Sequence, residues 1–122
     1  MANQGKLVKP QVVDQIWTDQ KIIFDSQTEI YSNPLSPETT EKIKEMLIEA
    51  VEKGSAKWTK LENLVVAGKT GTAQIPIAGH YDKEKTIASF IGFAPANKPK
   101  FVMLVSLSEP QTSPWGSETA AP

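Results

Sequence analysis

Two apolar runs in the second half of the chain limit its possible fold more than any other feature. The runs TIASFIGFA and FVMLVSL occupy residues 86–94 and 101–107, with a short connection flanked by Pro95 and Pro99 between them. Two strands joined by so short a connection pair as an antiparallel hairpin, because a parallel pair needs a much longer crossover. Apolar residues occupy intervening as well as alternate positions, so we expect both faces of these strands to be covered.

A helix is predicted at residues 36–53. Ser36 can cap it, Pro37 suits its first turn, and Gly54 is expected to end it in a left-handed conformation. Its pattern consists of the apolar stripe Ile43, Met46, Leu47, Ala50 and Val51 and the ion pairs Glu38–Lys42 and Glu49–Lys53. The narrow stripe and charged outer face favour packing on a sheet over binding a partner.

Three further segments read as extended. Residues 5–13 suggest an edge strand that tolerates Pro10, residues 16–24 a second strand, and residues 64–75 a third. His80 and residues 82–85 are expected in a solvent-exposed connection. The tryptophans Trp17, Trp58 and Trp115 are expected to pack, with Trp58 at a helix–strand junction and Trp115 partly exposed.

These elements predict an α+β fold with an antiparallel sheet and one packed helix. The 122 residues suffice for one domain, but one full helix cannot cover both faces of the sheet. The ending PWGSETAAP resembles a helix start without its helix, so we expect residues 1–122 to be a single partial domain. The alternative is a small complete α+β domain with frayed ends. Uncovered apolar surface in a partial domain predicts self-association, with exchange of elements between copies as one route.

Composition excludes several classes of function. A net charge of −1 gives no reason to expect nucleic acid as a partner, and all 13 basic residues are lysine. Without cysteine, and with His80 as the one histidine, we expect no disulfide, no metal site and no cofactor. Neither an apolar signal core nor a run of about 18 apolar residues occurs, so we expect a soluble chain without a targeting segment.

The candidate functional residues lie in the stretch VVAGKTGTAQIP, residues 65–76. A phosphate-binding loop would need glycine at position 63, but that residue is Asn63, and the residues that follow the motif do not open a helix. As a strand, the stretch instead offers the cation of Lys69, the hydroxyls of Thr70 and Thr72, and close backbone access at Gly71. These groups predict a wall that recognises an anion. The alternative is an ordinary strand with an exposed lysine and a glycine bulge.

The Lys-Thr-Gly tripeptide is also one of the three motifs of penicillin-binding proteins and class A β-lactamases. The longer form AGKTGTAQ resembles the class B high-molecular-weight penicillin-binding proteins, the transpeptidases of cell-wall synthesis. The resemblance continues through GKLVKPQVV, the predicted helix, ASFIGFAP and FVMLVSLSEP, and so covers essentially the whole chain. It implies the antiparallel sheet fold of penicillin-binding proteins and serine β-lactamases.

The resemblance also implies roles for single residues. Lys69 would assist proton transfer in the catalytic cleft, and the Thr70 and Thr72 hydroxyls would hold the substrate carboxylate. The Thr72 N–H would form half of the oxyanion hole, and Gly71 would let the acyl donor lie alongside the strand. The partners would be peptidoglycan stem peptides and β-lactams. The parent protein would be membrane-anchored, with this domain on the extracytoplasmic face.

Two of the family's motifs are missing from the chain. There is no Ser-x-x-Lys and no Ser-x-Asn, so the nucleophile and its base are absent. We therefore expect this chain alone to be inactive, although the resemblance makes its parent a serine D,D-transpeptidase. The alternatives are a piece of a serine β-lactamase or β-lactam sensor, and a small non-enzymatic module that binds a carboxylate or a peptide terminus.

Overall fold

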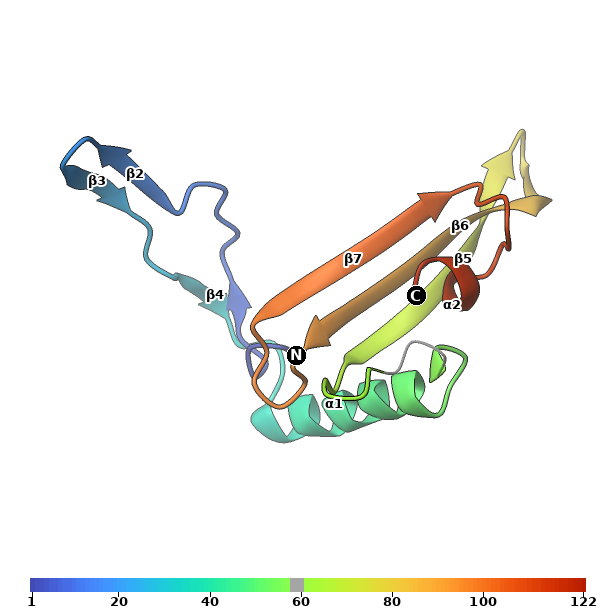
Figure 1. Ribbon diagram of the computed structural model, residues 1–122, viewed down its shortest axis with the longest axis horizontal. Coiled ribbons are helices and arrows are strands. Elements are labelled where there is room, and N and C mark those ends of the chain that lie inside the picture. The colour runs from blue at the N-terminus through green and yellow to red at the C-terminus, as the bar shows by residue number, and fades with distance from the viewer. Residues whose placement is uncertain (58–60) are drawn as a thin grey trace.

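The computed structural model describes residues 1–57 and 61–122, and a three-stranded antiparallel sheet forms its centre (Figure 1). β5 (Ala67–Ile77) pairs with β6 (His80–Ala94), and β6 pairs with β7 (Phe101–Ser108). The antiparallel hairpin predicted from the two apolar runs is confirmed, and β5 lies at an edge of the sheet.

The connection between β5 and β6 is shorter than the sequence suggested. Ala78 and Gly79 make the whole turn, with φ angles of 41° and 89°, and Ile77 pairs directly with His80. Positive φ at both positions matches the right-handed twist of the strands, and glycine adopts it at little cost. His80 and residues 82–85 therefore lie within β6, and the prediction of a loop there was wrong. Charged residues are tolerated in this part of the strand because it extends beyond the core.

The predicted helix is present as α1 (Pro37–Glu52). The Ser36 hydroxyl caps it by accepting a hydrogen bond from Thr39 N at 3.1 Å. The ion pairs Glu38–Lys42 and Glu49–Lys53 form at 2.7 and 2.8 Å.

The left-handed ending predicted at Gly54 is wrong, because Gly54 is not among the residues with positive φ. A Cβ at Gly54 would lie 2.3 Å from the Ala50 carbonyl oxygen. The last turn of the chain around α1 therefore leaves no room for a side chain at this position.

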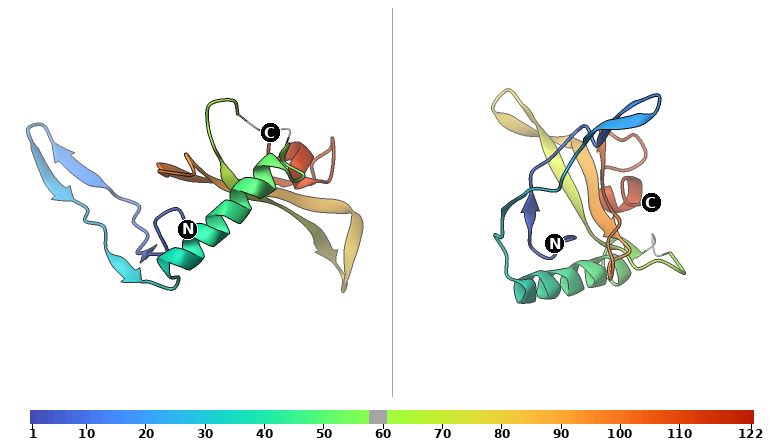
Figure 2. Two further views of the ribbon diagram at one scale, coloured as in Figure 1. Left: turned by 90° about the horizontal axis from the view of Figure 1, so that it is seen from below. Right: turned by 90° about the vertical axis from the view of Figure 1, so that its left-hand side faces the viewer.

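Helix α1 crosses one end of β5, as the views in Figure 2 show, and buries a slightly different stripe from the predicted one. Leu47 and Ile48 pack against a buried cluster that includes Phe93, and Val51 belongs to the cluster around Phe90. Met46, predicted in the stripe, is 67% exposed. The helix meets the sheet at an edge, so a position one step round the helix points past the sheet to solvent.

The N-terminal third forms two small strand pairs. β1 (Leu7–Val8) pairs with β4 (Ile30–Ser32), so only two of the residues 5–13 form the predicted edge strand. β2 (Gln15–Thr18) and β3 (Lys21–Asp25) form a hairpin that projects from the body (Figure 1). The single strand predicted for residues 16–24 is therefore two strands.

Of the three tryptophans, Trp17 lies on this hairpin and is 65% exposed, so its predicted packing was wrong. Trp115 is 56% exposed, in agreement with the prediction of partial exposure. Trp58 lies outside the described residues.

The two faces of the central sheet are covered unequally. A short helix, α2 (Gly116–Thr119), contacts β5 and β6, and Ala120 packs with Val51 and Phe90. The expectation of cover on both faces is not met within residues 1–57 and 61–122. Apolar side chains of β7 remain more than half exposed, namely Phe101, Val102, Met103 and Leu104. Among the helices described, none is long and apolar enough to span a membrane.

We predict that Phe90→Ala will strongly destabilise the fold, because the ring joins both helices to the sheet. Removing a buried phenylalanine ring costs about 3–5 kcal/mol in the free energy of unfolding. Urea unfolding followed by circular dichroism measures this cost. Met46→Ala on exposed α1 surface serves as the control and should change stability by less than about 0.5 kcal/mol. Equal effects of the two substitutions would contradict this account of the core.

Candidate active site

The four candidate residues Lys69, Thr70, Gly71 and Thr72 follow one another along β5. Because side chains alternate along a strand, Thr70 and Thr72 lie on the face that carries Phe90. Lys69 and Gly71 belong to the opposite face. The predicted site residues are thus consecutive on an edge strand, but they do not share one face of the sheet.

The backbone of β5 presents Thr70 and Thr72 to the open edge. Thr86 O accepts a hydrogen bond from Glu109 N at 2.8 Å, and Ala94 O accepts one from Lys100 N at 3.0 Å. Even-numbered residues of β6 therefore turn their backbone groups toward β7, and odd-numbered residues turn theirs toward β5. The β5 partners of those odd-numbered residues include Lys69 and Gly71. By alternation, the N–H and C=O groups of Thr70 and Thr72 point away from the sheet.

Lys69 reaches round this edge to its neighbour. Its Nζ donates a hydrogen bond to Thr70 O at 3.0 Å and lies 3.5 Å from Thr70 Oγ1. The structure therefore brings the Lys69 ammonium and the Thr70 hydroxyl together although their Cβ atoms point to opposite faces. A cation, a hydroxyl and outward backbone donors at one edge suit an extended anionic ligand.

Because Gly68 and Gly92 have no side chains, the Phe90 ring can lie close against the backbone of β5 and β6. A Cβ at Gly68 would lie 2.5 Å from the Phe90 ring, and one at Gly92 would lie 2.9 Å from it. On the other face, a Cβ at Gly71 would lie 2.7 Å from Ser89 Oγ. The contact with Ser89 therefore favours glycine at position 71 whether or not a ligand approaches the strand there.

Thr72 has a partner that the sequence did not reveal. Gly116 N donates a hydrogen bond to Thr72 Oγ1 at 3.1 Å, across a separation of 44 residues. No local pattern connects these positions; a glycine at the start of α2 was the only available signal.

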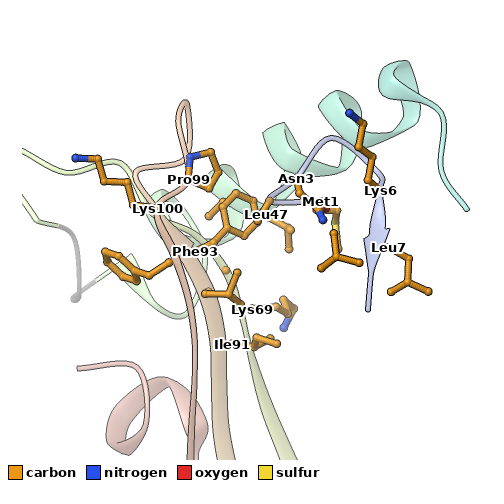
Figure 3. A pocket seen from close by; sticks show the side chains of 17 residues that line it. Met1, Asn3, Lys6, Leu7, Leu47, Lys69, Ile91, Phe93, Pro99 and Lys100 are labelled. Carbon is orange, nitrogen blue, oxygen red and sulfur yellow. The ribbon is translucent and has the colours of Figure 1, made fainter. Parts of the chain in front are cut away.

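An apolar groove with a volume of about 640 Å³ adjoins the Lys69 face (Figure 3). Lys69, Ile91 and Phe93 line it from the sheet, and Leu47 lines it from α1. Thr70, Gly71 and Thr72 are not among its lining residues, so the hydroxyl side of the motif lies outside this groove. No cluster of His, Cys, Asp and Glu that could hold a metal ion occurs among the described residues.

The hairpin end beyond the motif is fixed by Asp82. Its carboxylate accepts hydrogen bonds from Glu84 N at 2.8 Å and Lys85 N at 3.1 Å. These two backbone donors lower the pKa of Asp82 below its ordinary value. Lys85 in turn pairs with Glu109 at 2.8 Å, which raises the pKa of the lysine.

Comparison with known proteins identifies the fold. The family model for the "Penicillin binding protein transpeptidase domain" matches residues 1–122. The chain belongs to the penicillin-binding protein transpeptidase family. The resemblance inferred from AGKTGTAQ is thereby confirmed at the level of the family, and so is the α+β fold with its antiparallel sheet.

Individual members of the family match along nearly the whole chain. Stage V sporulation protein D of Bacillus subtilis is 35% identical over 98% of this chain. The D,D-transpeptidase domain of a peptidoglycan glycosyltransferase from Eggerthella lenta is 25% identical, with a TM-score of 0.80 over 98% of this chain. Penicillin-binding protein A of M. tuberculosis, solved as a penicillin G acyl-enzyme, is 27% identical, with a TM-score of 0.74 over 88% of this chain. The chain spans only 19%, 27% and 23% of these three proteins.

We predict that lowering the pH will release the hairpin end when Asp82 is protonated. Because the folded pKa of Asp82 is lowered, its stabilising effect is present above the ordinary value of 3.8 and is lost as the pH falls through the lowered value. NMR amide signals of Glu84 and Lys85 should shift together, with a midpoint below 3.8. Asp82→Ala should abolish this transition. A midpoint at or above the ordinary value would contradict the proposed contacts.

Proposed function

We propose that this chain is the C-terminal part of the transpeptidase domain of a class B penicillin-binding protein, and that β5 is its substrate-recognition strand. The observation that carries the proposal is the open edge of β5. There Lys69 and the outward backbone of Thr70 and Thr72 lie together, in a chain that matches the family from end to end.

The parent protein would crosslink peptidoglycan stem peptides by serine acyl transfer. A serine from a Ser-x-x-Lys motif outside this chain attacks the penultimate D-alanine carbonyl, and the terminal D-alanine leaves as the free amine. The amine of a neighbouring stem peptide then attacks the acyl-enzyme and releases the serine. Because its substrate lies outside the cell membrane, the parent would act at the extracytoplasmic face and be anchored there.

Each candidate residue has a role in this scheme. Thr72 N–H would donate to the developing oxyanion, and the Thr70 and Thr72 hydroxyls would bind the terminal carboxylate. Lys69 would supply positive charge beside the serine and its base, and Gly71 would keep the strand accessible to the acyl donor. β-Lactams would occupy the same site, a proposal supported by the penicillin G acyl-enzyme of the M. tuberculosis relative.

We predict that this chain alone will not be labelled covalently by a fluorescent penicillin, because it has no nucleophile. The parent transpeptidase should be labelled, and Lys69→Met in the parent should slow acylation by about tenfold or more. Lys98→Met, which removes an exposed lysine elsewhere, is the matched control and should leave the rate unchanged. Labelling of the isolated chain, or an unlabelled parent, would refute the corresponding half of the proposal.

We also propose that the isolated chain associates with itself through the open side of β7. This strand carries eight residues without a charge, and Val102 and Leu104 are 60% and 64% exposed. An uncharged, apolar edge strand readily pairs with a second copy, because two identical antiparallel edges are self-complementary.

Sedimentation velocity tests this proposal, and the sedimentation coefficient should rise with protein concentration. Leu104→Glu should shift the equilibrium toward monomer because it places a charge on the contact surface. Met46→Glu, on the exposed side of α1, should have no such effect. A monodisperse monomer at high concentration would refute self-association.

A further inference from the structure

We infer that Gly116 is a positioning residue for Thr72: its backbone N–H fixes the Thr72 hydroxyl so that the O–H proton is available to the substrate carboxylate. The inference rests on the proposed function, and it adds a second element, α2, to a site otherwise built from β5. Gly116 itself need not touch the substrate.

The contact is direct and lies partly inside the fold. Gly116 N donates to Thr72 Oγ1 at 3.1 Å, and Gly116 is buried. A threonine hydroxyl has one proton to donate and two lone pairs to accept with. When one lone pair accepts the Gly116 N–H, the hydroxyl proton is left for another acceptor. A carboxylate, which can only accept, is the matching ligand.

Only glycine fits at position 116. A Cβ there would lie 2.3 Å from Gly71 O, 2.6 Å from Ser89 O and 3.0 Å from Ser89 N. All three atoms belong to the backbone of β5 and β6, so a side chain at position 116 would push the start of the short α2 away from the sheet. The missing side chain therefore lets the start of α2 lie directly on the motif strand, within hydrogen-bond reach of Thr72.

Separate contacts hold Gly116 in this position. The Thr86 hydroxyl donates to Pro114 O at 2.9 Å just before the helix. After the helix, Ala120 is 4% exposed in the cluster with Val51 and Phe90. Position 116 is thus fixed on both sides by contacts that do not involve Thr72.

The Thr70 hydroxyl, like that of Thr72, has a protein donor beside its oxygen. Lys69 Nζ lies 3.5 Å from Thr70 Oγ1, and an ammonium can only donate. Each hydroxyl of the motif therefore faces a protein donor and keeps its own proton for a ligand. This common orientation suits one anion bound by both.

The test compares two substrates in the parent transpeptidase: benzylpenicillin and its methyl ester, which lacks the carboxylate charge. We expect Gly116→Ala and Thr72→Val each to lower the acylation rate for the acid by about tenfold, the effect of one lost hydrogen bond to a charged group. The rate for the ester should fall less than the rate for the acid, because the ester lacks the carboxylate charge that strengthens this hydrogen bond. The double variant should lose no more than the larger single loss, since both changes remove the same contact.

Ser113→Ala is the matched control. It removes the hydrogen bonds that Ser113 Oγ donates to Glu118 Oε2 and accepts from Trp115 N, but it keeps the Pro114 and Ala120 contacts that hold Gly116 in place. It should leave the ratio of the acid and ester rates unchanged. If Gly116→Ala lowers both rates equally, its role is only structural and the inference is overturned.

A second measurement does not depend on acylation or on the folding of Gly116→Ala. The Gly116 amide should exchange with solvent at least about tenfold faster in Thr72→Val than in the unaltered protein, and Thr72→Ser should restore slow exchange. Equal exchange in all three proteins would overturn the contact. A parent that no penicillin acylates would refute the proposed function, whereas the exchange result would still decide whether Gly116 holds the Thr72 hydroxyl.

Discussion

The packing of Phe90 is the contact on which the rest of the structure depends. Its ring covers Gly68 and Gly92, where any Cβ would lie 2.5 and 2.9 Å from it. The ring also belongs to one buried cluster with Val51 of α1 and Ala120, the residue after α2. Both helices are therefore placed relative to the motif strand by apolar packing, and the polar contacts of Thr72 follow from that placement.

The two edges of the sheet differ in a way that suits different neighbours. The edge at β5 carries the exposed Lys69, and its register with β6 shifts between Gln74 and Pro76. A charge, an irregularity and a proline are features by which proteins keep an edge strand from pairing indiscriminately. β7 has none of them along its eight residues. An edge like that of β5 can remain open for a ligand, whereas an edge like that of β7 is stable only when it is covered.

The sequence predicted the elements that have local signals. Ser36 and Pro37 mark the start of α1, and the continuous apolar runs correctly predicted β6 and β7 as an antiparallel pair. Errors arose where a local signal is absent or where the deciding interaction is not local. The turn between β2 and β3 lacks the glycine or asparagine that usually marks a two-residue turn, and the exposure of Met46 depends on where α1 crosses the sheet.

The same distinction applies within the candidate site. The order Lys69-Thr70-Gly71-Thr72 could be read from the sequence, as could its assignment to a strand. That the backbone of Thr70 and Thr72 points outward required the register with β6. The Gly116 contact required the tertiary fold, because it joins residues 44 positions apart.

This difference gives the two hydroxyls of the motif unequal dependence on the fold. Thr70 receives its donor from Lys69, the adjacent residue, so that orientation persists wherever β5 keeps its strand conformation. Thr72 receives its donor from α2, which is only four residues long and relies on the Phe90 cluster to stay in place. A change that displaces Gly116 would therefore remove the donor to Thr72 and leave the donor to Thr70 in place. Packing in the Phe90 cluster thus helps to orient the Thr72 hydroxyl, because it holds the Gly116 N–H in place.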